Sequence, residues 1–255
     1  MQTIVASLLW PEGDAPGPVM HLAPWFDSRF LPVEELAGRL EAQTHRRSVK
    51  THTPADGIPW FDDCLYVVVG RDGRDACMSQ LNHMANMRPE VLAALATTAA
   101  EEGIEIGSRP GTSDVHEFFP WWLDGEFFDH VESFVARSHQ ANVLLVHYED
   151  LLADLEGEMR RVARFIDVDV PAASWSAVVD RCTFAAMKAR ADEINDFDRL
   201  FDGGAETFLY KGTNGRWRDV LTDDELAAYD RTVAERLSPI AAAWLAAGRS
   251  ALSPV

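Results

Sequence analysis

Cysteine is scarce in this sequence, and its few cysteines form none of the common paired motifs. Cys64, Cys77 and Cys182 are the three, an odd number with no CxxC pair. This pattern argues against a disulfide framework and indicates free thiols in a reducing compartment, the cytoplasm. No HExxH or CxxC ligand spacing occurs either, so we expect no metal.

Positive charge is also in short supply. Lysine and arginine together number 23 against 41 aspartates and glutamates, which gives a formal net charge of −18. Such a surface repels nucleic acid and anionic membranes, so an anionic ligand must be held by a local cluster of cations and N–H groups. The longest apolar stretch near the start, Ile4 to Trp10, is too short to span a bilayer.

The chain does have enough apolar residues for one sizeable core. It has 255 residues, 47% of them hydrophobic, and we expect a single α/β domain over 1–255. Residues 65–70 and 142–147 are continuous apolar runs typical of buried parallel strands, with helices expected between and after them, including one at 222–246. The aromatic stretch 108–128 and the polar stretch 193–217 are expected to be irregular. This order predicts a parallel central sheet flanked by helices.

Polar residues follow three apolar runs at the points where strands are expected to end. Lys50 and His52 come after Val49, Arg71 follows Gly70, and His147 and Tyr148 follow Val146. In parallel sheets, ligands bind beyond the carboxyl ends of the strands. If the three runs are neighbouring strands, these side chains converge on one crevice.

Lys50 and His52 lie two residues apart, directly before Pro54. A neutral histidine can take a proton from an attacking hydroxyl, and a nearby ammonium can stabilise charge on a transferring or leaving oxygen. A lone histidine is more often structural than catalytic. The pair alone is therefore suggestive rather than specific.

Two further segments could bind an anion. Arg71 leaves a strand and Ser79 lies in the following helix, so a guanidinium fork and a hydroxyl could grip one phosphate. The alternative is a turn arginine paired with Asp72 or Asp75. The segment 208–221 carries Lys211 between Tyr210 and two glycines, a weak signal because most such loops are turns. No GxxxxGK[ST] or GxGxxG motif occurs.

Taken together, five segments resemble the cytosolic-type sulfotransferases, which use 3′-phosphoadenosine 5′-phosphosulfate (PAPS). "VKTHTP" is similar to that family's K-T-H-x-P segment, and "VVVGRDGRDACMS" to its strand-loop-helix for the 3′-phosphate. "VLLVHYEDL", "CTFAAMK" and "YKGTNGRW" are similar to its Y-E-D segment, its adenine-packing stretch and its R-K-G-x-x-G-x-W loop. Order and spacing match over nearly the whole chain. The resemblance implies the P-loop-NTPase-like sulfotransferase fold.

The resemblance also implies a role for individual residues. His52 corresponds to the general base on the acceptor hydroxyl, and Lys50 assists at the sulfuryl group. PAPS is the implied sulfuryl donor and adenosine 3′,5′-bisphosphate (PAP) the product. The implied contacts to this nucleotide come from Arg71, Ser79, Lys211 and Gly212 at the 3′-phosphate, and from Tyr148, Cys182 and Phe184 near the adenine.

The sequence departs from the family pattern in three places. The family's phosphosulfate loop, P-K-S-G-T-T-W, and its first strand would stand immediately before Met1, so we expect a chain that lacks both and is N-terminally truncated relative to the family. Tyr210 stands where the family has arginine, which is expected to weaken nucleotide binding. The family's dimer motif is met only at Arg218 and Thr222, so that dimer is not predicted and the oligomeric state stays open.

We therefore expect a sulfotransferase that moves a sulfuryl group from PAPS to a hydroxyl of a small-molecule or glycolipid acceptor. The alternative is a catalytically inactive truncated homologue that only binds PAP or a protein partner. The acceptor pocket is expected to come from large side chains in variable segments, although many of them could instead be core residues. The candidates are Trp25, Phe26, Met84, Met87, Phe118, Phe119, Trp121 and Trp122.

Overall fold

A computed structural model describes residues 1–28, 31–101, 103 and 110–252. The chain forms two compact units, each assembled from three separate segments. The first unit comprises Met1–His52, Asn86–Arg109 and Val170–Lys211, and the second comprises Thr53–Ala85, Pro110–Asp169 and Gly212–Val255. The extent of the expected single domain stays a prediction, whereas the expected α/β class with a parallel sheet flanked by helices is confirmed.

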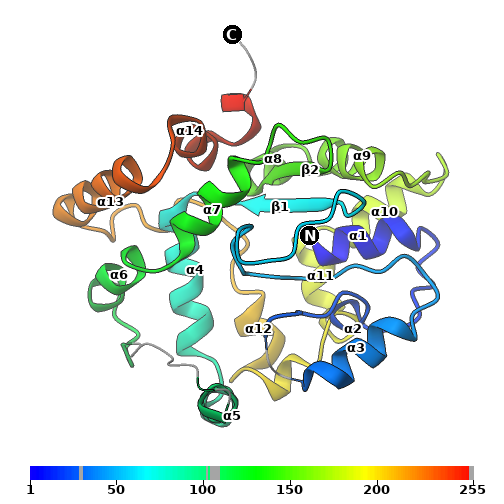
Figure 1. Ribbon diagram of the computed structural model, residues 1–255, viewed down its shortest axis with the longest axis horizontal. Coiled ribbons are helices and arrows are strands. Elements are labelled where there is room, and N and C mark those ends of the chain that lie inside the picture. The colour runs from blue at the N-terminus through cyan, green and yellow to red at the C-terminus, as the bar shows by residue number, and fades with distance from the viewer. Residues whose placement is uncertain (29–30, 102, 104–109, 253–255) are drawn as a thin grey trace. The chain divides into compact units, whose positions relative to one another are not determined.

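The second unit contains the sheet. Strands β1 (Tyr66–Gly70) and β2 (Val143–His147) pair in parallel, from Tyr66 opposite Val143 to Gly70 opposite His147. They lie side by side in Figure 1, β1 in cyan and β2 in green. Both strands stand where the apolar runs predicted them, because continuous β-branched residues suit a strand covered on both faces.

Helices of the second unit pack around this sheet on one core. Its largest buried side chains include Phe118, Phe128 and Trp244. Trp244 lies directly against the α-carbon of Gly70, at the end of β1. The helices are α4 (Gly73–Ala85), α6 (Val115–Leu123), α7 (Phe127–Val135), α8 (Tyr148–Ala153), α9 (Leu155–Phe165), α13 (Asp223–Arg236), α14 (Pro239–Ala247) and the 3₁₀ turn η3 (Gly248–Leu252).

Two expectations in this unit are wrong. The aromatic stretch expected to be irregular contains helix α6, which begins where the Asp114 carboxylate accepts a hydrogen bond from the His116 N–H (2.8 Å). The single helix expected at 222–246 is two helices, because Pro239 cannot continue α13 and instead starts α14, with Ser238 as its N-cap. Residues 108 and 109 of the expected irregular stretch lie outside the described residues.

The first unit is helical in its described residues. Its core includes Ala6, Val19, Ile194 and Phe201. The polar stretch 193–217, expected to be irregular, contains helical turns here, and Phe197 stacks on Phe208 with ring centroids 4.4 Å apart. The helices are α1 (Gln2–Leu9), α2 (Val19–Leu22), α3 (Val33–Glu41), α5 (Pro89–Glu101), α10 (Trp175–Arg181), α11 (Phe184–Ala189), η1 (Ala191–Glu193), η2 (Phe197–Arg199) and α12 (Gly204–Phe208).

The strand expected to end at Val49 is not formed. Lys50 makes only an isolated parallel bridge with Trp25, in which Lys50 N–H donates to Pro24 O and Phe26 N–H donates to Lys50 O, each at 2.8 Å. Val49 is 51% exposed, unlike a buried strand residue, and Pro24 has no N–H with which to extend the ladder. The backbone of Lys50 is thus held by the two hydrogen bonds of this bridge and not by a strand of the sheet.

Candidate functional site

At the end of β1, Arg71 lies among groups from three parts of the second unit. Its Nε donates to Asn214 Oδ1 and its Nη2 to Thr213 O, each at 2.8 Å. The guanidinium carbon lies 4.6 Å from the ring centroid of Tyr148, the first residue of α8. Burial raises the pKa of Tyr148, and the charge of Arg71 opposes that rise. The structure therefore brings three predicted nucleotide-binding segments together.

A buried carboxylate anchors the glycine loop beside Arg71. Asp75 is 2% exposed, and its two oxygens accept hydrogen bonds from the N–H groups of Gly215 (2.7 Å) and Arg216 (3.0 Å). Arg71 Nη2 lies 4.0 Å from the same carboxylate, so the alternative pairing of Arg71 with Asp75 is also present. Gly212 (φ 64°) and Gly215 (φ 77°) adopt left-handed backbone conformations that glycine tolerates best.

Ser79 lies on α4, four residues after Asp75. Residues four apart share one face of a helix, so Ser79 follows Asp75 on the face that meets the glycine loop. Its side chain is half-buried. This placement suits a hydroxyl that joins Arg71 in holding one anion.

His147, between Val146 and Tyr148, has a structural role. It is fully buried, and its Nδ1 accepts from the Glu149 N–H (3.3 Å), so Nε2 carries the proton and donates to Leu245 O (3.1 Å). Burial lowers the pKa of this imidazole, chiefly by disfavouring the charged form. Of the two residues after Val146, only Tyr148 thus meets the cluster around Arg71.

In the first unit, Lys50 and His52 both contact one aromatic ring. Lys50 Nζ lies 4.5 Å from the ring centroid of Trp25, and the imidazole of His52 lies 4.6 Å from it. His52 is exposed and Lys50 is half-buried. Burial lowers the pKa of Lys50, and the nearby Asp27 carboxylate opposes that shift.

Asp27 is a residue that sequence reasoning missed. Its Oδ2 accepts hydrogen bonds from the His52 N–H (3.0 Å) and from Thr51 Oγ1 (3.2 Å). Asp75 was likewise considered only as an ion-pair partner of Arg71. The sequence offers one signal for Asp75, its position one helical turn after Arg71, and none for Asp27, which precedes its partners by more than twenty residues.

Three other predicted nucleotide contacts fall in the first unit. Cys182 is buried, its Sγ donates weakly to Thr3 O at 3.8 Å, and burial raises its thiol pKa. Phe184 is the first residue of α11 and is half-buried. Lys211 is exposed, with Nζ 5.0 Å from the ring centroid of Tyr210. The gathering of these residues around a nucleotide stays a prediction.

The candidates for an acceptor pocket divide by burial. Phe118, Phe119 and Trp122 are at most 2% exposed and belong to the core of the second unit. For these three, the alternative that they are core residues is the one the structure shows. Met84 and Trp121 are half-buried against that core, and Met87 packs against the core of the first unit. Trp25 is half-buried and Phe26 is 49% exposed. Five of the eight side chains thus keep surface that a ligand could touch.

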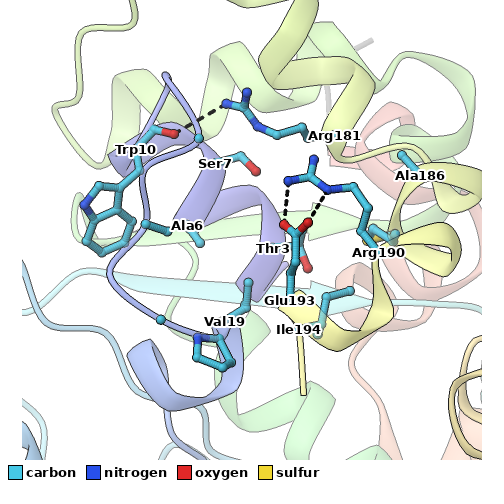
Figure 2. Close-up of a pocket in the computed structure, with 15 residues that line it drawn as sticks. Thr3, Ala6, Ser7, Trp10, Val19, Arg181, Ala186, Arg190, Glu193 and Ile194 are labelled. Atoms are coloured by element: carbon cyan, nitrogen blue, oxygen red, sulfur yellow. Dashed lines mark hydrogen bonds and ion pairs between the residues drawn. The ribbon is translucent and has the colours of Figure 1, made fainter. Parts of the chain in front are cut away.

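The first unit also holds a cavity of about 380 Å³, shown in Figure 2. Its walls come from α1, the 13–19 segment and residues 181–194, with the Arg190–Glu193 ion pair on one side. Arg181 Nη2 donates to Pro11 O at 2.6 Å. None of the predicted catalytic or nucleotide-binding residues lines this cavity. No group of acidic, histidine and cysteine side chains in the described residues could hold a metal ion, and no described helix is long and apolar enough to cross a membrane.

Known proteins with a similar sequence are sulfotransferases. A family model described as "Sulfotransferase domain" matches residues 11–240. A glycolipid sulfotransferase of Mycobacterium bovis is 32% identical over 280 residues, covering 99% of this chain and 85% of that protein. A glycolipid sulfotransferase of Mycobacterium tuberculosis is 33% identical over 283 residues with the same two coverages.

Solved structures with a similar fold give the same class. Retinol dehydratase, solved with androsterone and the inactive cofactor PAP, has a TM-score of 0.68 at 22% identity, covering 93% of this chain and 77% of that one. Mouse sulfotransferase SULT7A1, solved with PAP, has a TM-score of 0.68 at 18% identity, covering 98% and 83%. These likenesses concern the fold.

The fold and the matched domain define a group-transfer enzyme of the α/β class. The chain belongs to the sulfotransferase family.

Proposed function

We propose that this protein transfers a sulfuryl group from PAPS to a hydroxyl of a lipid-like acceptor, with His52 as general base. The observation that carries the proposal is the cluster of Arg71, Tyr148 and the glycine loop within one unit. A guanidinium, an aromatic face and glycine-rich backbone suit a phosphorylated nucleotide. The two structures with bound PAP, both of this fold, support the choice of nucleotide.

The residues around Arg71 fit a phosphate. The hydrogen bonds of Arg71 to Asn214 and Thr213 use Nε and Nη2, and Nη1 makes none with the described residues. Both Nη1 hydrogens are therefore left to donate to an anion in a fixed direction. Ser79 on the adjoining helix would add a hydroxyl. We assign the 3′-phosphate to these two residues with Lys211 and Gly212, and the adenine to Tyr148, Cys182 and Phe184.

His52 and Lys50 would divide the chemistry between them. His52, as neutral imidazole, takes the proton of the acceptor hydroxyl while that oxygen forms a bond to sulfur. The bond between sulfur and the bridging oxygen of the donor breaks, and PAP leaves with the bonding electrons. Lys50 stabilises negative charge on the sulfuryl or bridging oxygen. Because such in-line transfers have loose transition states, positioning and charge stabilisation supply most of the rate.

A lipid-like acceptor is proposed from the relatives and from the exposed aromatic surface. Two relatives that match almost the whole chain are named glycolipid sulfotransferases. Trp25 contacts the imidazole of His52 and the ammonium of Lys50, and the adjacent Phe26 is 49% exposed. Aromatic faces beside a base favour an acceptor with an apolar body and a hydroxyl at its end.

The proposal is tested by separating turnover from nucleotide binding. PAP is titrated calorimetrically into the protein and into His52→Ala, and transfer from radiolabelled PAPS to octyl glucoside is measured for both. We expect micromolar or tighter binding of PAP by both proteins and turnover only by the unsubstituted one. Binding of PAP without turnover by either protein would support the alternative, a homologue that only binds nucleotide. Equal turnover by both would refute His52 as the base.

A further inference from the structure

We propose that Asp27 is a positioning residue for the reaction, holding the Lys50–His52 segment through its carboxylate while Trp25 orients the two side chains. This inference rests on the proposed function, and it adds two residues that the sequence did not connect with the catalytic pair.

The first step concerns the backbone up to Lys50. The bridge between Trp25 and Lys50 supplies two hydrogen bonds of 2.8 Å, one on each side of Lys50. The bridge ends at Lys50 and does not continue as a strand through Thr51 and His52. Pro54 prevents the segment from continuing as a strand, so the position of the imidazole depends on contacts other than a β-ladder.

The second step is a carboxylate that binds the chain directly after the bridge. Asp27 lies two residues after Trp25, and its Oδ2 accepts from both Thr51 Oγ1 (3.2 Å) and the His52 N–H (3.0 Å). A hydrogen bond to an ionised acceptor is about twice as strong as a neutral one. Asp27 therefore continues the support of the chain where the bridge ends, and it does so at the backbone of His52 itself.

The third step concerns the side chains. The Trp25 indole lies 4.5 Å from Lys50 Nζ and 4.6 Å from the His52 ring, whose plane is tilted by 51° to it. One ring thus limits where both groups can move. Because Trp25 also belongs to the backbone bridge, the segment from Trp25 to Asp27 holds the main chain and the side chains of the pair together.

This arrangement matters because proton transfer depends on distance. A displacement of about 1 Å in a reacting group can lower the rate by roughly 100-fold. Loss of the Asp27 carboxylate would leave the His52 amide without this acceptor, and the imidazole would sample more positions. The carboxylate also lies near the Lys50 ammonium and favours its charged form. The expected loss is in turnover, since Asp27 belongs to neither of the groups assigned to the nucleotide.

The test compares Asp27→Ala with Asp27→Asn, which keeps an oxygen acceptor in the same place. We expect Asp27→Ala to lower kcat for transfer from PAPS to octyl glucoside by roughly 100-fold, with the KM for PAPS and the affinity for PAP within about threefold of the unsubstituted protein. Asp27→Asn is expected to recover about tenfold of that loss. Asp56→Ala serves as the matched control, because Asp56 is exposed and makes no hydrogen bond or ion pair with the described residues. It should leave kcat unchanged.

A second measurement does not depend on turnover. Hydrogen exchange at the His52 amide should be at least about tenfold faster in Asp27→Ala than in the unsubstituted protein. Unchanged exchange, or a kcat for Asp27→Ala within about threefold of the unsubstituted protein, would overturn the positioning role. Parallel loss of PAP binding and of the thermal transition would instead make Asp27 a general structural residue and overturn it too.

The positioning role and the proposed function fail in different ways. If Asp27 acts through His52, the double variant His52→Ala/Asp27→Ala should be no slower than His52→Ala, and a further large loss would contradict that pathway. If His52→Ala keeps full turnover, the general-base assignment fails first. If His52→Ala is inactive while Asp27→Ala is fully active, only the role of Asp27 is lost.

Discussion

The indole ring of Trp244 lies directly against the α-carbon of Gly70, the last residue of β1. Trp244 is fully buried, and Gly70 immediately precedes the arginine assigned to the nucleotide. Gly70 belongs to the first of the three segments that make up the second unit, and Trp244 belongs to the last. Their contact ties the end of the strand, and hence the start of Arg71, to helix α14.

The contact predicts a large effect of one added methyl group. In Gly70→Ala the new Cβ would overlap the Trp244 ring, and overpacking of this kind costs about 1–3 kcal/mol, or more when the ring cannot move. Urea unfolding should therefore show a lower midpoint. Gly38→Ala is the control, since Gly38 lies in α3 with no atom near the position of a Cβ, and it should be neutral or stabilise by about 0.5–1 kcal/mol. Equal midpoints for the two variants would contradict the packing.

A second prediction concerns pH and the exposed pair between α6 and α13. His116 Nδ1 lies 2.9 Å from Glu225 Oε1, and this hydrogen bond raises the pKa of His116 above its ordinary 6.5. For Glu225, burial raises the pKa, but hydrogen bonds from Thr222 and His116 outweigh it and the net pKa lies below 4.5. The stabilisation from His116 is therefore complete below pH 6.5 and is lost as the pH rises through the folded pKa.

The measurement is the melting temperature of His116→Gln against pH. Its deficit relative to the unsubstituted protein should be largest between about pH 4.5 and 6.5 and should shrink as the pH rises further. His21→Gln, at an exposed histidine whose imidazole has no polar partner among the described residues, should show no such trend. A deficit that grows with pH would show that the sign is wrong.

A third prediction separates the phosphate from the nucleoside. Arg71→Ala removes a charged fork aimed at the anion, which should weaken PAP by roughly 10- to 100-fold and leave adenosine binding nearly unchanged. Arg71→Lys should recover little, because an ammonium cannot reproduce the paired donors. Calorimetric titration with both ligands checks this, with Arg39→Ala in the exposed pair with Glu35 as the control. Equal losses for the two ligands would argue against a 3′-phosphate site.

A fourth prediction is a gain of affinity. Tyr210 is 42% exposed beside Lys211, in the place where the resembled family has arginine. Tyr210→Arg should strengthen PAP binding by about tenfold, and the gain should diminish with added salt because it comes from charge. Tyr210→Phe should bind PAP as the unsubstituted protein does. If arginine and phenylalanine behave alike, position 210 does not reach the nucleotide.

Local pattern accounts for part of this structure. Strands β1 and β2 could be predicted because each is an unbroken run of β-branched and aliphatic residues. Whether a strand forms before Lys50 could not be predicted in the same way. So short a segment forms a strand only if a distant part of the chain pairs with it, and here the segment at Trp25 pairs at Lys50 alone. Helix α6 was missed because its signal is one capping aspartate, Asp114, before a run of aromatics that contains a proline.

Some features of the candidate site could be predicted from the sequence and others could not. Arg71, Tyr148 and the glycine loop were expected together and lie together in one unit. Asp27 and Asp75 were not expected to bind backbone N–H groups, because a carboxylate that does so has the same sequence appearance as one on the surface. How the segments of the two units gather around one nucleotide remains a prediction for the titrations to decide.

The interleaved course of the chain bears on how this protein can be made in a cell. Each unit takes its last segment from beyond residue 169, and the second unit still needs the residues after Gly212. Neither core can therefore be completed before residues beyond 169 have been translated. At about 5–20 residues per second, apolar surface and the edges of β1 wait several seconds for their partners. Chaperone capture during synthesis should consequently matter more for this protein than for one whose domains finish in order.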